Sequence, residues 1–136
     1  MPILGLEPVR NNTYHVIRRE QVTYESGNRA FMLSVSWFPP RFADPVPELL
    51  HLQPVIPAGA AKLIEQRTGQ RITHGRMSRE ARRIKDDGRE GPLLRLRRGT
   101  PVLAEVYVWM SGQDVIEYGE YCLTMDHVTE NDFTLD

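Results

Sequence analysis

The sequence has few of the features that mark a secreted, membrane or disulfide-rich protein. A single cysteine, Cys122, stands among 136 residues, so no disulfide can form within the chain and a reducing compartment is favoured. The longest apolar runs have only the length of strands, and they contain Glu105 or Glu117, which argues against a membrane span. The first residues lack the basic and apolar regions of a secretory signal. We therefore expect a cytoplasmic protein with no membrane contact.

Strong charge and recognisable catalytic motifs are also missing. With 17 basic and 18 acidic residues the net charge is −1, which gives no electrostatic case for nucleic-acid binding by the whole domain. The four histidines have no metal-ligand spacing. No glycine-rich dinucleotide or phosphate loop is present, and no serine occupies a nucleophile elbow. We expect no metal, no cofactor and no enzymatic activity.

What is present fits one globular domain. The length of 136 residues, with 40% hydrophobic and 26% charged residues, is ordinary for a single soluble domain. Ten prolines and ten glycines favour strands and turns over a helical bundle. We expect residues 1–13 to be an irregular lead-in or linker remnant and residues 14–136 to form the domain.

Two hairpins are predicted. Residues 102–110 and 115–125 are rich in β-branched and aromatic residues, and a short turn containing Gly112 separates them. Residues 14–24 and 30–38 form a weaker pair around a turn at Gly27. The serines of the second run, Ser34 and Ser36, share a face that lines either solvent or a polar cavity.

The remaining segments predict one good helix and one long strand. Residues 39–57 contain six prolines, which allow at most a helical turn. Residues 58–67 are alanine-rich and end at Thr68-Gly69, a helix stop. Residues 70–85 read as a bent strand broken at Gly75, and residues 86–96 as a poor helix. The pattern is α+β, with an antiparallel sheet covered on one face by helix and loop.

Candidate functional residues are polar side chains within strands, because a buried charge is either paired or functional. They are Arg19, Ser36, Arg76, Glu80, Glu105 and Glu117. Glu117 shares a strand face with Gly119, which leaves space beside it, and with Tyr121. This suits a pocket for a ligand hydroxyl or amine, although the same face could be solvent-exposed. Gly59, at the start of the predicted helix, either admits an anion to free N–H groups or only eases a tight entry.

The order of several short segments resembles a known family. They are ESGNR to SWFPP in 25–40, AGAAKLIEQRTG in 58–69, RITHGR in 71–76, RGTPVL in 98–103, and VIEY in 115–118 followed by Asp126. From about residue 16 to 126 the chain resembles the UTRA domain, the effector-binding half of HutC-type GntR transcriptional regulators.

The resemblance implies a chorismate lyase-like fold, a curved antiparallel β-sheet with flanking helices and a ligand cleft. It implies a homodimer that binds a small-molecule effector and alters the DNA affinity of a fused or partner winged helix-turn-helix. DNA contact would need that domain, which this chain lacks. The alternatives are a stand-alone interaction module with a closed cleft or, further off, a chorismate lyase-like enzyme. The expected ligand-binding residues are Arg19, Ser36, Gly59, Arg76, Glu80, Glu117 and Tyr121.

Three departures from the family pattern bear on the ligand. Members often carry Ser-Leu-Tyr where this chain has Gly59, Ala60 and Ala61. A Tyr-Arg pair is replaced by Leu123-Thr124, and a common arginine by Tyr107. These losses favour an effector that is less anionic or larger than a sugar phosphate.

Overall fold

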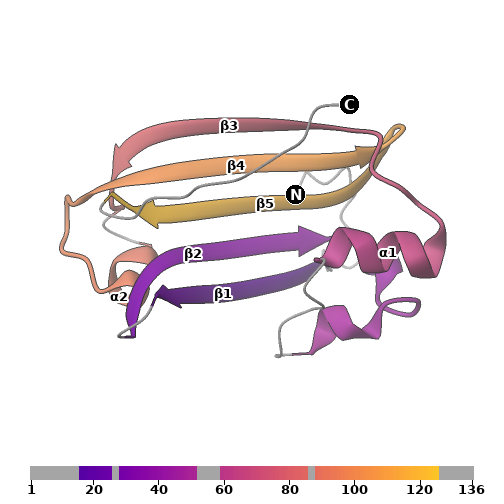
Figure 1. Cartoon of the computed structure of the whole chain (residues 1–136), viewed down its shortest axis with the longest axis horizontal. Coiled ribbons are helices and arrows are strands. Elements are labelled where there is room, and N and C mark those ends of the chain that lie inside the picture. Colours follow the sequence, from indigo (N-terminus) through magenta and orange to yellow (C-terminus); the bar gives the residue numbers. More distant parts are fainter. Residues whose placement is uncertain (1–15, 26–27, 52–58, 86–87, 126–136) are drawn as a thin grey trace, which may run out of the picture.

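The fold is a five-stranded antiparallel sheet with two helices (Figure 1). The computed structural model describes residues 16–25, 28–51, 59–85 and 88–125. The strand order is β1-β2-β5-β4-β3, which confirms the predicted α+β class. The elements are β1 (Ile17–Glu25), β2 (Arg29–Phe38), η2 (Pro40–Phe42), η3 (Pro47–Leu50), α1 (Ala60–Thr68), β3 (His74–Arg83), α2 (Glu90–Leu94), β4 (Pro101–Ser111) and β5 (Asp114–Thr124), where η marks a 3-10 helix.

Both predicted hairpins form, and they join side by side. Strands β4 and β5 pair around a turn at Gly112, whose φ of 60° suits a residue without a side chain. Strand β1 pairs with β2, and β2 in turn pairs with β5. The predicted lead-in at 1–13 and the residues after 125 lie outside the described residues.

The other segments correct the prediction in part. The break expected at Gly75 is wrong, because β3 runs through it and pairs with β4 along its whole length. Gly75 is needed for packing: a Cβ there would lie 2.0 Å from Cε3 of Trp109. Helix α1 begins at Ala60 and ends as predicted at Gly69, whose φ is 78°. The predicted start at residue 58 lies outside the described part of the chain.

Two apolar clusters hold the helices on opposite faces of the sheet. Helix α1 buries Leu63 and Ile64 against Phe38 and the η2–η3 segment. Helix α2 buries Leu94 against a second cluster that includes Leu33. Because Leu33 and Phe38 are an odd number of residues apart on β2, they point to opposite faces. The prediction of one covered face is therefore wrong, since each face is covered at one end.

Ile64 tests the first cluster. It is fully buried, so Ile64→Ala should lower the free energy of unfolding by about 2–5 kcal/mol through lost contacts and a cavity. The exposed Lys62→Ala on the same helix should change it by less than about 0.5 kcal/mol. Urea unfolding measures both, and equal effects would contradict the packing described.

Candidate functional site

One face of the sheet gathers most of the predicted polar residues, and we call it the polar face. Ser36 pairs with Gly119, which pairs with Tyr107, so these three positions lie in one row across β2, β5 and β4. Residues two positions away along each strand share the same side. The polar face comprises Arg19, Ser34, Ser36, Glu105, Tyr107, Trp109, Glu117, Gly119 and Tyr121.

At the centre of the polar face, a buried carboxylate accepts a hydrogen bond from a buried tyrosine. The Tyr107 hydroxyl donates to Oε2 of Glu117 at 2.5 Å, and the two residues are only 3% and 8% exposed. Burial raises the pKa of Glu117, while the hydroxyls of Tyr107 and Ser36 oppose that rise. Burial and the neighbouring carboxylate also raise the pKa of Tyr107. Tyr107 therefore stays a hydrogen-bond donor.

Glu117 differs from the other buried carboxylates of the described chain. Arg79 Nε lies 2.7 Å from Glu105, and the Arg82 guanidinium contacts Glu90 at 2.6 and 2.9 Å. Among the described residues, Glu117 has no such cation and is held by hydroxyl groups. A buried carboxylate without a cation is costly for stability, which marks Glu117 as a candidate for ligand contact.

The space predicted beside Gly119 is filled by Tyr107. A Cβ on Gly119 would lie 2.0 Å from Cζ of the Tyr107 ring. That ring packs between Trp109 and Tyr121, with centroid separations of 5.3 and 5.2 Å. The expected gap is therefore wrong in this structure, and an aromatic wall stands in its place.

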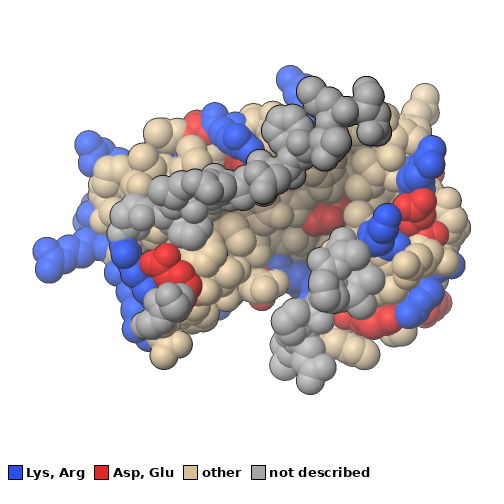
Figure 2. All heavy atoms as spheres, in the orientation of Figure 1, with Lys and Arg blue, Asp and Glu red and all other residues tan. Residues whose placement is uncertain are grey.

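Open space lies next to this wall, over β1 and β2. A cavity of about 630 Å³ is lined by β1, by both serines of β2 and by the end of η3. Its lining residues are Val16, Ile17, Arg18, Arg19, Glu20, Gln21, Val22, Ser34, Ser36, Leu49, Leu50 and His51. Figure 2 shows the molecule hollowed near its middle, where Figure 1 places β4 and β5, with acidic atoms at the floor of this hollow.

Arg19 fixes one wall of the cavity. Its Nη1 donates to the carbonyls of Glu48, Leu49 and His51 at 3.2, 2.9 and 2.8 Å. These carbonyls lie at the end of η3, where the last acceptors of a short helix can bond outside it. The Glu48 carbonyl also accepts from the His51 N–H at 3.1 Å. Arg19 thus ties the proline-rich segment to the sheet.

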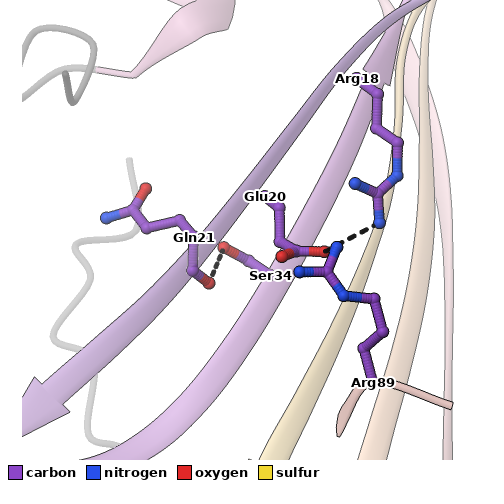
Figure 3. Close-up of polar contacts among 5 residues, drawn as sticks. All are labelled: Arg18, Glu20, Gln21, Ser34 and Arg89. Carbon is purple, nitrogen blue, oxygen red and sulfur yellow. Dashed lines mark hydrogen bonds and ion pairs between the residues drawn. The ribbon is translucent and has the colours of Figure 1, made fainter. Parts of the chain in front are cut away.

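Charged residues border the cavity at the β1 edge (Figure 3). Glu20 accepts from Arg18 at 3.0 Å and from Arg89, in the approach to α2, at 2.9 Å. Ser34 Oγ lies 3.4 Å from the Gln21 carbonyl, a long hydrogen bond. The carboxylate that shares the cavity rim is therefore already neutralised by arginines.

The structure brings four of the seven predicted site residues together. Arg19 and Ser36 line the cavity, and Ser36 Oγ lies 3.5 Å from the Tyr107 hydroxyl that contacts Glu117. Tyr121 belongs to the same aromatic wall. Ser36 thus connects the cavity to the buried pair.

The other three lie elsewhere. Arg76 pairs with Val108 and Glu80 with Ala104, in rows that alternate with the row of Tyr107. Both therefore belong to the face opposite to Glu117, and their role as ligand-binding residues stays a prediction. A strand's own sequence cannot say which of its faces joins a neighbour's polar face. Gly59 precedes α1 with a φ of 91° and is absent from the cavity lining.

Residues missed by sequence reasoning come from two places. Leu49, Leu50 and His51 line the cavity, and only the clustering of prolines hinted that this segment is held against the sheet. In the sequence, Tyr107 stands out only because it replaces a common arginine. Its hydrogen bond to Glu117 depends on the register of β4 with β5.

Comparisons with known proteins identify the fold. No protein-family profile matches the sequence, and a search of curated proteins finds no match. The C-terminal domain of YurK from Bacillus subtilis superposes with a TM-score of 0.69 at 14% identity, covering 94% of this chain and 81% of that one. A GntR-family transcriptional regulator from Enterococcus faecalis gives 0.66 at 16%, covering 88% and 78%.

The ligand-binding domain assigned to a GntR-family regulator of Bordetella bronchiseptica gives a TM-score of 0.65 at 19% identity, covering 88% of this chain and 74% of that one. The chain has the fold of GntR-family regulator C-terminal domains. Over the described residues, no helix is long and apolar enough to cross a membrane. The same residues hold no group of His, Cys, Asp or Glu side chains arranged to bind a metal ion.

The raised pKa of Glu117 predicts a pH-dependent stability. In the unfolded chain the Glu117 carboxyl has its ordinary pKa of 4.5, and burial raises that pKa in the folded protein. Between the two pKa values, folding therefore takes up a proton on Glu117. As pH rises through this range, the wild type should lose stability relative to Glu117→Gln. Thermal melts between pH 4 and 8 measure the difference, and Asp44→Asn, at an exposed position between η2 and η3, controls for loss of a carboxylate. A wild type that gains stability relative to Glu117→Gln as pH rises from 4 to 8 would contradict the assignment.

Proposed function

We propose that this domain binds a small-molecule effector and dimerises, as the sensing part of a GntR-type, HutC-like transcriptional regulator. In this role, effector binding changes the DNA affinity of a winged helix-turn-helix carried on the same protein or on a partner. The domain itself reads no DNA sequence. The protein works in the cytoplasm and is not an enzyme.

The observation that carries this proposal is the cavity on the polar face. Its volume of about 630 Å³ lies within the usual range for metabolite sites. Ser36 joins it to Glu117, a buried carboxylate held by hydroxyls alone among the described residues. The fold shared with GntR-family ligand-binding domains supports the same reading.

The chemistry of the groups beside the cavity, on the polar face, indicates the kind of effector. Glu117 accepts hydrogen bonds, so the ligand presents a hydroxyl or an amine toward it. The nearby rings of Tyr107, Trp109 and Tyr121 offer an apolar or cation-binding wall. Arg19 is engaged with three carbonyls, which fits an effector less anionic than a sugar phosphate.

A thermal-shift screen against amines, amino acids, polyols and sugars tests the binding. A true effector should raise the melting temperature in proportion to the logarithm of its concentration above Kd. Glu117→Gln should weaken it about tenfold or more, since a hydrogen bond to a charged group contributes about 1.5–3 kcal/mol.

The matched control is Asp44→Asn, which removes an exposed carboxylate outside the polar face and should leave the affinity unchanged. No shift with any compound would favour the interaction module with a closed cleft, in which Tyr107 permanently fills the space over Gly119. An equal loss of affinity in both variants would move the site away from Glu117.

A further inference from the structure

Strand β3 forms one edge of the sheet, and it is unusually exposed. Nine of its ten residues are exposed, including Met77 at 44%. Within the described chain only β4 pairs with it. The opposite edge, β1, is flanked by η3 through Arg19. An edge strand is a template for pairing with another chain unless its sequence prevents this.

The backbone of β3 shows which groups face outward. Ile84 N–H donates to the Thr100 carbonyl at 2.9 Å, and the next residues, Arg83 and Pro101, are register partners. In an antiparallel pair, hydrogen-bonded and non-hydrogen-bonded positions alternate. Even-numbered residues of β3 therefore bond to β4, and odd-numbered ones, including Met77 and Arg79, present N–H and C=O groups to the outside.

The charges of β3 divide into engaged and available groups. Arg79 is paired with Glu105, and Arg82 with Glu90. For Arg76 and Glu80 no ion pair or side-chain hydrogen bond is found among the described residues, although, besides Glu90, the charge of Glu80 contributes to the raised pKa of Arg82. Both lie on the face opposite to the polar face, two positions either side of Ser78.

A second copy of this strand fits one register best. With a two-fold axis at Ser78, antiparallel pairing sets Arg76 of each copy opposite Glu80 of the other, giving two ion pairs of cross-strand geometry. It also sets Met77 opposite Arg79, so the outward backbone groups meet as hydrogen-bonded pairs. An axis at Arg79 would set Arg76 opposite Arg82, and an axis at Met77 would leave Arg76 opposite Ser78.

We propose that the domain dimerises by antiparallel pairing of β3 with β3 of a second copy, with the two-fold axis at Ser78. The two five-stranded sheets then form one continuous sheet. This inference rests on the dimerisation in the proposed function and names its interface. Edge pairing at β3 covers neither face of the sheet any further, so the cavity over β1 and β2, at the other edge, stays accessible in the dimer.

Charge reversal tests the ion pairs. Light scattering after gel filtration should give twice the chain mass of 15.7 kDa for the wild type. Arg76→Glu and Glu80→Arg each set like charges opposite one another and should raise the dimer dissociation constant at least tenfold. The double variant should restore the dimer. Lys62→Glu, an exposed charge reversal on α1, should leave it unchanged.

A cysteine scan reads the register directly. At a non-hydrogen-bonded antiparallel pair the Cα atoms lie about 4.5 Å apart, within the range for a disulfide. Under mild oxidation Ser78→Cys should give a covalent dimer, while Arg76→Cys, Met77→Cys and Glu80→Cys should not. The native Cys122 is buried, and burial raises the pKa of its thiol to about 12, so it stays out of the reaction.

The outcomes separate the interface from the function. If the dimer cross-links at a β3 position other than Ser78, the proposed register is wrong. If it cross-links at no β3 position and charge reversal leaves it intact, the proposed interface is wrong. In both cases dimerisation itself stands. A wild-type mass of 15.7 kDa at high protein concentration overturns the dimer altogether, while effector binding remains open to the thermal-shift screen.

Discussion

The hydrogen bond from Tyr107 to Glu117 is the contact on which the polar face depends. It joins β4 to β5 across the sheet and places a carboxylate in a buried position without a cation among the described residues. The bond requires Gly119, because any side chain there would meet the Tyr107 ring. It also reaches Ser36 and, through it, the cavity on β1 and β2. One interaction thereby links the sheet register, the aromatic wall and the ligand-sized space.

The two apolar clusters lie outside the central row of this face. One cluster binds α1 and the η2–η3 segment to one end of the sheet, and the other binds α2 to the opposite face. Neither cluster includes Ser36, Gly119 or Tyr107. The domain is stabilised at its two ends, and the polar centre is free to carry residues chosen for recognition. Buried groups of this kind lower stability and are retained where they serve binding or specificity.

Much of the fold could be predicted from the sequence because its signals are local. The turn at Gly112 and the runs of β-branched and aromatic residues fixed the second hairpin, and the alanine-rich run before Gly69 fixed α1. Glu117 could be singled out because a charge within an apolar strand is rare. Its partner Tyr107 could not be identified from the sequence, because their contact depends on the register between β4 and β5. For the same reason the sequence could not place Arg76 and Glu80 on the face opposite to Glu117. A glycine within a strand suggested a break at Gly75, because the Trp109 ring that packs over it lies on another strand.

The account's central claim is that Glu117 is a buried carboxyl group held by hydroxyls and not by a cation. An NMR titration of its side-chain carboxyl carbon in the ligand-free domain, assigned by its loss in Glu117→Gln, measures this most directly. The account predicts a midpoint above 4.5, the ordinary value for glutamate. A midpoint below that value would mean that a cation or further donors stabilise the carboxylate, and it would contradict the account.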